Sequence, residues 1–259
     1  MAATSLSRTP SSTGNRRTFT LSVWCKKMSS SQMNFLGAGA SNAQNHIQFE
    51  NNRFQMRYYT SSNTTIVNTD ALLRDESAWY HLVCAVDTTQ ATASNRIKLY
   101  INGEQQSLND ETFPGQNGDW GFNVSGETMY IGRRGHSAAY YYDGEMAHFA
   151  WVDGQQLTPS TFGETDSTSG IWKWKDITGV TWGTNGFYLK FENSANLGLD
   201  SSGQGNNFTL SGSGTRNIDN PSIVYNTLNG VSNPANGYTL SNANTECTVS
   251  GQSFVRTFI

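Results

Sequence analysis

Apolar residues recur at every second position through most of the chain, which is the pattern of β-strands with one buried face. The segment TFTLSVWCK, residues 18–26, places four apolar side chains on one face: Phe19, Leu21, Val23 and Cys25. The segment WYHLVCAVD, residues 79–87, is apolar on both faces, which is typical of a central strand. The hydrophobic pattern therefore predicts a sheet protein.

Two pairs of these strands are separated by short turns that favour hairpins. Asn51 and Asn52 separate HIQFE from RFQMRYY, and Asn102-Gly103 separates RIKLYI from EQQ. Asparagine and glycine tolerate the positive φ angles that two-residue hairpin turns require. Each pair is therefore predicted to form an antiparallel hairpin.

The rest of the chain predicts further strands and one helical turn. The alternating segments are residues 127–134, 144–154, 185–193 and 206–212. In QLTPSTFGE, Thr158 is expected to cap a single turn of helix in which Pro159 takes the first position. Strands with almost no helix predict an all-β fold, an antiparallel jelly-roll sandwich.

The character of the chain changes near residue 216. Residues 216–259 are rich in Asn and Ser, carry two of the five prolines and have only brief apolar runs, at 223–225 and 254–259. We therefore expect a sandwich over residues 1–215 and an extended C-terminal arm over 216–259. Short strands of such an arm are expected to pair with another surface or subunit.

Composition and charge narrow the function classes. The chain of 259 residues is 36% hydrophobic, 12% aromatic and only 14% charged, as expected of a globular β protein. Its formal net charge is −3 and its 17 Lys and Arg are scattered, so nucleic-acid binding is not expected. It has no run of about 18 apolar residues and no apolar region of a secretory signal, so we expect no membrane insertion, and folding in a cytoplasm.

The three cysteines, Cys25, Cys84 and Cys247, are odd in number and far apart in the sequence. Disulfide frameworks and zinc clusters need paired or closely spaced cysteines. Buried or inert thiols are therefore favoured.

Several segments occur in an order known from one family. Trp79 and His81 are followed by KLYING at 98–103, Ile131-Gly132, GEMAHFAW at 144–151 and LTPSTF at 157–162. These segments resemble, in that order, the landmarks of laminin G-like domains of the concanavalin A-like lectin/glucanase fold. The resemblance covers about residues 16–212; it is specific for the fold and much less so for activity.

The segment FENSANLGLDSSGQGNNFTLSG, residues 191–212, resembles the segment that commonly begins such domains, but here it comes last. That order implies a circular permutation, which a sandwich tolerates because its ends lie close together. The permuted order, the leader SLSRTPSSTGNRRTFT and the downstream NIDNPSIVYNTLNG resemble structural proteins of tailed bacteriophages, especially marine ones. The resemblance implies a virion protein that assembles in the host cytoplasm with other virion proteins, as a homo-oligomer.

Catalysis is not predicted. The E-x-D-x-x-E pattern of glycosidases with this fold is missing, and the carboxylates at 75–76, 110–111 and 164–166 lie in loop-like contexts. No helix follows Ser201-Ser202-Gly203, so it is not a nucleophile elbow. Gly203-Gln204-Gly205 lacks the lysine and the helix of a phosphate loop. We expect no enzymatic activity, with a polysaccharide depolymerase as the alternative.

The same loop offers one candidate metal site. Asp200, Ser202 and Asn206 carry hard oxygen ligands close in sequence, as calcium loops do. One carboxylate is few for a divalent cation, and these residues also suit an Asx-type turn with glycines at positive φ. The turn is favoured; calcium is the alternative and the one cofactor to consider.

Two segments predicted to be loops carry aromatic residues beside hydrogen-bonding groups, as carbohydrate sites do. The candidate sugar-binding residues are Trp120, Arg133, His136, Tyr140, Tyr141 and Tyr142. Adjacent strand residues face opposite sides, so the three tyrosines cannot all point into the core. Contact with a glycan and packing between subunits are both open interpretations. The four histidines show no metal-ligand spacing, and His81 and His148 are expected to be hydrogen-bonded sheet residues.

Together these features predict a non-enzymatic bacteriophage virion protein, a fibre, appendage or decoration subunit. Its lectin-like sandwich is expected to bind a host-surface polysaccharide, and its arm to anchor the subunit. A purely structural decoration protein without a ligand is the main alternative.

Overall fold

The computed structural model describes residues 3–39, 43–60, 64–217 and 219–222, and the backbone of three further strands between 238 and 254. Contacts within the chain divide it into two units, Met1–Arg216 and Asn217–Ile259. The first unit holds two large sheets, and the second holds a small one.

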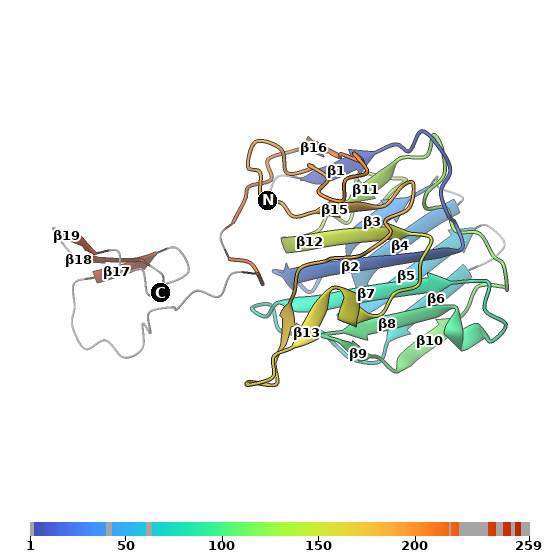
Figure 1. Ribbon diagram of the computed structural model, residues 1–259, viewed down its shortest axis with the longest axis horizontal. Helices are drawn as coiled ribbons and strands as arrows, with labels where there is room; N and C mark the ends of the chain where they lie inside the picture. The colour runs from blue at the N-terminus through green and yellow to red at the C-terminus, as the bar shows by residue number, and fades with distance from the viewer. Residues whose placement is uncertain are drawn as a thin grey trace. The chain divides into compact units, whose positions relative to one another are not determined.

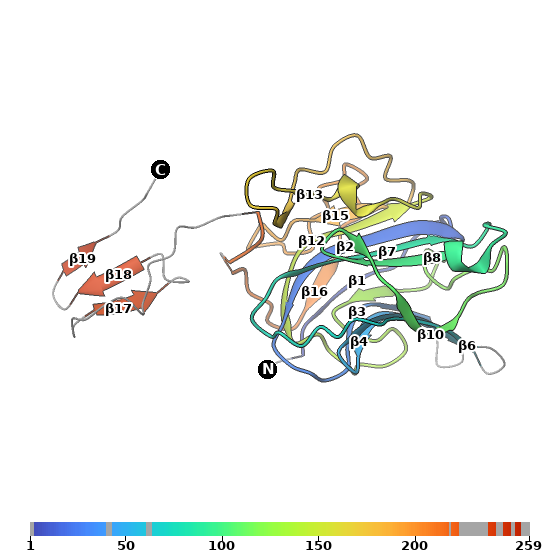
Figure 2. The ribbon, with the colours of Figure 1, turned by 90° about the horizontal axis from the view of Figure 1, so that it is seen from below.

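The two large sheets lie face to face (Figures 1 and 2) and all their strand pairs are antiparallel. The eight-stranded sheet has the order β10 (Leu108–Thr112), β6 (Thr64–Thr69), β5 (Arg53–Thr60), β4 (Ala43–Glu50), β3 (Met33–Ala38), β11 (Met129–Ile131), β1 (Ser5–Arg8) and β16 (Thr209–Ser211). The six-stranded sheet has the order β15 (Phe187–Leu189), β12 (Gly144–Asp153), β2 (Thr18–Lys27), β7 (Tyr80–Asp87), β8 (Ile97–Ile101) and β9 (Glu104–Gln105). The predicted all-β antiparallel sandwich is confirmed.

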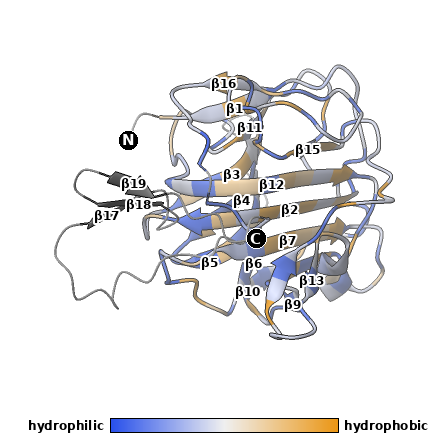
Figure 3. Ribbon diagram, turned by 60° about the vertical axis from the view of Figure 1, so that its left-hand side comes forward, coloured by the Kyte–Doolittle hydropathy of each residue, from blue (hydrophilic) through white to orange (hydrophobic). Residues whose placement is uncertain are grey.

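The main core lies between these sheets, and apolar residues follow β2, β7 and β12 (Figure 3). Phe19, Leu21, Val23 and Cys25 of β2 are all fully buried in it, as their alternation predicted. The ring of Phe19 stacks on Trp151 with centroids 4.6 Å apart and meets the edge of Trp120 at 6.3 Å. Such aromatic pairs add to the free energy of burial.

A second apolar cluster covers the outer face of the six-stranded sheet. Val83 and Ala85 of β7 pack there with Phe162 and Tyr188. The strands β13 (Gly163–Thr165) and β14 (Trp172–Trp174) form a hairpin outside this sheet, and Figure 2 shows β13 on that side. β7 is thus buried on both faces, as its sequence predicted.

Two buried histidines of the six-stranded sheet contact the β13–β14 hairpin. The Trp172 indole Nε1 donates to His81 Nδ1 at 2.9 Å, so His81 Nε2 carries the proton and donates to Ser22 Oγ at 2.8 Å. His148 Nδ1 lies 2.7 Å from the Tyr188 hydroxyl, and its ring stacks on Trp174 at 4.6 Å. Both histidines are hydrogen-bonded sheet residues, as expected.

The local turns agree with the sequence with one exception. Asn51, Asn52, Asn102 and Gly103 all have positive φ at the two predicted hairpins. Pro159 opens the short 3-10 turn η2 (Pro159–Thr161), but the Thr158 side chain does not cap it. The Thr158 hydroxyl instead lies 2.8 Å from Ser160 Oγ, so the predicted cap is wrong.

Several strands that the pattern missed are short or irregular. β1 lies within the segment that resembles a phage leader, β3 contains a bulge between Asn34 and Leu36, and β10 contains one between Asn109 and Glu111. A bulge inserts a residue and breaks the alternation on which strand prediction depends. The 3-10 turns η1 (Ala93–Asn95) and η2 are the helices of the described part, and neither is long or apolar enough to cross a membrane.

The ends of the first unit meet in the eight-stranded sheet. β1 pairs with β11 on one side and with β16 on the other, with Leu6 opposite Leu210. The segment that resembles the start of a laminin G-like domain therefore lies beside the first strand of this chain. This neighbourhood is what a circular permutation requires.

The second unit contains an antiparallel sheet of β17 (Tyr238–Ser241), β18 (Glu246–Val249) and β19 (Gln252–Phe254). The apolar run at 223–225 and most of that at 254–259 lie outside the described residues, as does the side chain of Cys247. Cys25 and Cys84 are buried free thiols, as predicted. The role of this unit as an anchoring arm stays a prediction.

We expect the sandwich to lose stability as the pH falls below about 6.5, the ordinary histidine pKa. Burial lowers the pKa of His81 to about 3 and that of His148 to about 4. The unfolded chain therefore binds protons below pH 6.5 that the folded chain does not. The contribution of the two histidines to the free energy of unfolding is therefore complete above pH 6.5. It decreases as the pH falls towards 3 to 4, by at most about 1.4 kcal/mol per pH unit for each histidine.

Urea unfolding between about pH 7.5 and 4.5, above most carboxylate titration, measures this slope. The His81→Gln variant has one titrating ring fewer, so its stability should depend less on pH although it is lower throughout. A free energy of unfolding that does not change over this range would contradict the prediction.

Candidate functional site

The connection between β11 and β12, residues 132–143, folds back over the outer face of the eight-stranded sheet. The Gly132 amide donates to the Phe35 carbonyl and the Asn34 amide to the Tyr140 carbonyl, both at 3.0 Å. A Cβ on Gly37 of β3 would lie 2.5 Å from the Gly135 nitrogen, closer than any side chain tolerates. Glycine at position 37 therefore lets this loop lie directly on the sheet.

The loop carries two arginines, each held against a tyrosine ring. Arg133 Cζ lies 3.6 Å from the ring centroid of Tyr130 in β11, and Arg134 Cζ lies 3.8 Å from that of Tyr140. Tyr140 has a φ of 53°, rare outside glycine, and is 41% exposed. A stacked guanidinium keeps its N–H edge available for a planar acceptor.

Strand residues beneath the loop extend this set. His46 of β4 lies directly opposite Arg57 of β5 in the sheet register, and its ring centroid lies 6.0 Å from that of His136 in the loop. We call the combined set the arginine–tyrosine face, and it consists of His46, Arg57, Tyr130, Arg133, Arg134, His136 and Tyr140.

The potential at this face is positive. Burial first, and then the charges of Arg134, His136 and Arg57, lower the pKa of His46 to about 3. Burial and Arg134 also lower the pKa of His136. Both imidazoles are therefore uncharged at neutral pH. No ion pair found among the described residues includes Arg57, Arg133 or Arg134.

Several polar atoms of this region lack a hydrogen-bond partner within the described part of the chain. They are Asn34 Oδ1, His46 Nδ1, Arg57 Nε, Arg134 Nε and His136 Nδ1, and all are buried. Buried polar atoms in folded proteins nearly always have a protein or water partner. A group of such atoms in one place therefore marks where water or ligand hydroxyls are needed.

A ladder of amide side chains supports the face from the neighbouring positions of the same strands. Gln48 Nε2 of β4 donates to Gln55 Oε1 of β5 at 2.5 Å, and Gln55 Nε2 donates to Asn68 Oδ1 of β6 at 2.6 Å. Gln48 and Gln55 lie two residues from His46 and Arg57, on the same side of the sheet. The ladder fixes the strands that carry the site, which is how a binding site is preorganised.

The structure brings together only some of the residues predicted to bind sugar. Arg133, His136 and Tyr140 lie on the arginine–tyrosine face, and Tyr141 is half-buried in the same loop. Tyr142 turns inward: its ring lies 5.1 Å from that of Phe35, and its hydroxyl donates to the Lys26 carbonyl at 3.0 Å. The three tyrosines thus divide between the core and the surface.

Trp120 requires a correction. It was predicted to be an exposed platform, but it is 1% exposed and packs against Phe19, Tyr58 and Phe122 in the main core. The loop that contains Trp120 places this side chain in the core. Trp120 is therefore removed from the candidate sugar-binding residues.

Sequence reasoning missed His46, Arg57, Tyr130 and Arg134. A usable signal was present for two of them. Ile47 and Met56 point into the core, and alternation therefore turns His46 and Arg57 outward. Nothing local predicted that the loop at 132–143 would lie over them.

The candidate calcium residues do come together, but as a network of hydrogen bonds. The Asp200 carboxylate accepts from the amides of Tyr188, Ser202 and Asn206 at 2.8 to 2.9 Å and from Ser202 Oγ at 2.8 Å. Gly203 and Gly205 have positive φ, as the turn requires. These four donors engage the oxygens that a calcium ion would need, which favours the turn interpretation.

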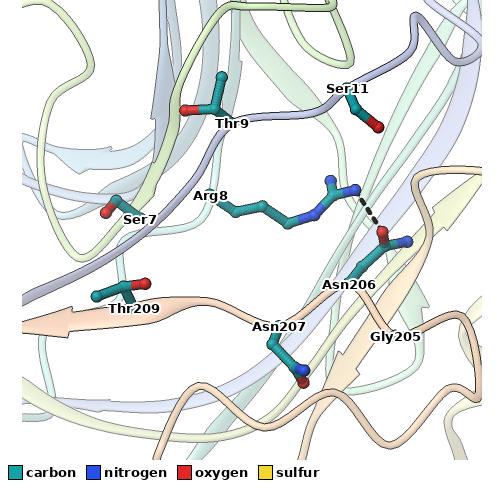
Figure 4. A pocket seen from close by; sticks show the side chains of 8 residues that line it. All are labelled: Ser7, Arg8, Thr9, Ser11, Gly205, Asn206, Asn207 and Thr209. Atoms are coloured by element: carbon teal, nitrogen blue, oxygen red, sulfur yellow. Dashed lines mark hydrogen bonds between the residues drawn. The ribbon is translucent and has the colours of Figure 1, made fainter.

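Arg8 of β1 supplies positive charge beside this turn. Its guanidinium points at Asn206 and donates to Asn206 Oδ1 (Figure 4) and to Asn185 Oδ1. Burial lowers the pKa of Arg8, and the nearby charges of Asp200 and Asp153 offset only part of this effect. An adjoining pocket of about 480 Å³ is lined by Ser7, Arg8, Thr9, Ser11, Gly205, Asn206, Asn207 and Thr209.

The described residues that could be considered for catalysis are engaged in other contacts. Ser22 and His81 lie 2.8 Å apart, but the Trp172 indole occupies the His81 Nδ1 position where a triad would place a carboxylate. Glu111 and Glu164 lie in the strands β10 and β13, so their predicted loop context is wrong. Asp166 is bound by Lys173 Nζ at 3.0 Å. The described part also holds no group of three His, Cys, Asp or Glu side chains placed to bind a metal.

Comparisons with known proteins agree on the fold. The profile of a family described as "Concanavalin A-like lectin/glucanases superfamily" matches residues 2–161, more than half of the chain. A search of curated proteins gives no significant match.

Three solved structures are similar to this chain, all at low sequence identity. A putative carbohydrate binding protein from Bacteroides ovatus has 14% identity and a TM-score of 0.50, with 85% of this chain and 62% of that chain covered. A heptameric SAP-like pentraxin from Limulus polyphemus has 15% identity and a TM-score of 0.45, with 73% and 86% covered. The sialidase module CBM40 from Ruminococcus gnavus, bound to sialyllactose, has 16% identity and a TM-score of 0.40, with 56% and 78% covered.

We expect Asp200 to be a structural residue. Replacing it in Asp200→Asn removes two acceptor positions and the charge beside Arg8, and should lower the free energy of unfolding by about 2–4 kcal/mol. Ser202→Ala removes one donor to Asp200 and the acceptor of the Gln204 amide but leaves the carboxylate in place, and should cost about 1 kcal/mol. Urea unfolding measures both values.

The same experiment with calcium or with a chelator separates the two interpretations. Under the turn interpretation neither addition changes the unfolding midpoint of the unmodified protein. A midpoint that rises with calcium in the unmodified protein but not in Asp200→Asn would contradict it, because a bound ion stabilises the folded state.

Proposed function

The chain belongs to the concanavalin A-like lectin/glucanase superfamily, and we propose that its sandwich is a non-enzymatic glycan-binding module. The observation that carries the proposal is the arginine–tyrosine face. There, polar atoms without partners in the described part of the chain lie beside an exposed aromatic ring on a rigid sheet.

The unpartnered atoms suit hydroxyl groups. Arg57 Nε and Arg134 Nε are donors, and Asn34 Oδ1 is an acceptor. His46 Nε2 lies 3.2 Å from Gln44 Oε1 and donates to it, which leaves His46 Nδ1 as an acceptor. A sugar hydroxyl both donates and accepts, so a polyhydroxylated ligand bound over these atoms can satisfy such a mixed set through bridging water. The Tyr140 ring adds apolar surface for the C–H faces of a sugar.

The absence of catalysis is part of the proposal. Hydrolysis of a glycoside in this fold needs two carboxylates on either side of the scissile bond. The strands that carry the arginine–tyrosine face, β3, β5 and β11, contain no Asp or Glu, and the acid of β4, Glu50, accepts from Gln48 Nε2 at 2.9 Å. A polysaccharide depolymerase would therefore lack its reacting pair at this face.

We further propose that the protein is a structural subunit of a tailed-bacteriophage virion, a fibre, appendage or decoration protein. The permuted order of its segments, the leader and the downstream segment support this origin. The second unit, with its own small sheet, would contact other virion proteins or further copies of the subunit. A decoration protein without a ligand is the competing function.

Replacing Tyr140 or Arg134 should weaken glycan binding. Each of Tyr140→Ala and Arg134→Ala removes one partner of the same stacked pair, and we expect the affinity to fall at least about tenfold. A glycan array followed by calorimetry with the bound sugar measures this.

The matched control for these variants is Arg74→Ala, an exposed arginine outside the arginine–tyrosine face. It should bind like the unmodified protein, and urea unfolding should show that all three variants are folded. If the unmodified protein binds no sugar on a broad array, the competing function without a ligand is correct.

Removing the second unit should abolish incorporation into particles. We expect phage whose gene for this protein ends after residue 216 to contain none of the truncated protein, because its proposed contacts with the particle lie in residues 217–259. Mass spectrometry of purified particles measures this, with full-length Tyr140→Ala as a control that should be incorporated normally. Normal incorporation of the truncated protein would exclude the anchoring role.

A further inference from the structure

We infer that the glycan recognised at the arginine–tyrosine face is acidic and is held through its carboxylates by Arg57, Arg133 and Arg134. This inference rests on the proposed function and names the class of glycan. It goes beyond that function because a sugar site built for neutral hydroxyls does not need three guanidinium groups.

The three arginines of the face have no acidic partner among the described residues, unlike the ion-paired arginines of the sandwich. Arg17 pairs with Asp119 at 2.7 Å and Arg53 with Asp70 at 3.6 Å. The three arginines of the face form no such pair with any described residue. Cations on a protein surface that lack a counter-charge are available for an anionic ligand.

The elements packed against the face carry almost no acidic residues. β3, β5, β6 and β11 contain none, and residues 132–142 of the loop contain none. Glu50 of β4 is four residues from His46, about 13 Å along the strand. Asp143 lies at the far end of the loop, where its carbonyl accepts from the Met28 amide at 2.9 Å. The positive potential is therefore not cancelled locally.

The geometry of the two loop arginines also favours carboxylates. Arg133 and Arg134 each lie close over a tyrosine ring, which limits the movement of the guanidinium. A fixed guanidinium presents two parallel N–H groups that match the two oxygens of a carboxylate. Two such groups on successive residues suit a ligand with repeated carboxylates, as in a polymer of uronic acids.

The positive charge of the arginine–tyrosine face does not follow from a basic composition, because the formal net charge of the whole chain is −3. The face is also too small for nucleic acid, because a protein that binds DNA neutralises phosphates along an extended stripe. An acidic glycan is the ligand that combines hydroxyl groups with local negative charge.

The test uses the full chain and an array of bacterial polysaccharides. Each uronic-acid polymer is printed beside its carboxyl-reduced form, which keeps the sugar backbone and loses the charge, and neutral polysaccharides and double-stranded DNA are included. We expect binding to acidic polymers, a loss of roughly ten- to hundredfold on carboxyl reduction, and weaker binding at high salt.

Variants assign the effect to the arginines. Arg133→Gln and Arg134→Gln should each weaken binding to the acidic polymer roughly tenfold or more, and by a clearly larger factor than they weaken binding to its reduced form. Arg134→Lys keeps the positive charge but loses the paired N–H donors of the guanidinium. Its affinity for the acidic polymer should therefore lie between those of Arg134→Gln and the unmodified protein. Arg74→Gln is the matched control and should bind like the unmodified protein.

The outcomes separate the inference from the proposed function. Equal binding of acidic and reduced polymers, or binding of neutral polysaccharides alone, would overturn the inference and leave glycan binding in place. DNA bound as tightly as the acidic polymers would overturn it in favour of general attraction of polyanions. No binding on any part of the array would overturn the proposed function, and the inference with it.

Discussion

Apolar packing between the two large sheets is the interaction on which the rest of the sandwich depends. Ile47 and Phe49 of β4 and Met56 of β5 point into this core. Because side chains alternate along a strand, the same packing turns His46, Gln48 and Arg57 to the outer face. A shift of one residue in register would exchange the two sets. The core therefore determines which polar groups are available on the outer face as well as the stability of the fold.

Much of the fold follows from local sequence, and much of the site does not. The strands β2 and β7 and the hairpins at Asn51-Asn52 and Asn102-Gly103 were predictable because period-two alternation and positive φ are local properties. Whether an aromatic residue in a loop is buried depends on contacts far along the chain. This is why Trp120 was wrongly placed on the surface and why the three tyrosines at 140–142 were not separated. The missed members of the arginine–tyrosine face lie on different strands and meet only when the 132–143 loop crosses the sheet.

The segment around Asp200 shows how residues typical of a metal site can instead complete a fold. Asp200 engages the backbone amides of its own loop and of Tyr188 in β15, while Asn206 accepts from Arg8 in β1. A few residues later, β16 pairs with β1. The hydrogen bonds of this loop thus join the last strand of the sandwich to the first. A carboxylate and an amide at this junction supply the polar contacts that closing the sheet requires.

Arg8 and the arginines of the arginine–tyrosine face illustrate two uses of one residue type. Arg8 lies between asparagine oxygens and near two carboxylates, so its charge is compensated by the fold itself. Arg133 and Arg134 are oriented by tyrosine rings, which fix the guanidinium without neutralising it. Burial first, and then nearby charges that include Arg134, lower the pKa of His46 and of His136, so neither imidazole adds to the charge of the arginines at neutral pH. The face thus keeps oriented cations that form no ion pair with a described residue, which is the arrangement that the proposed acidic ligand would complete.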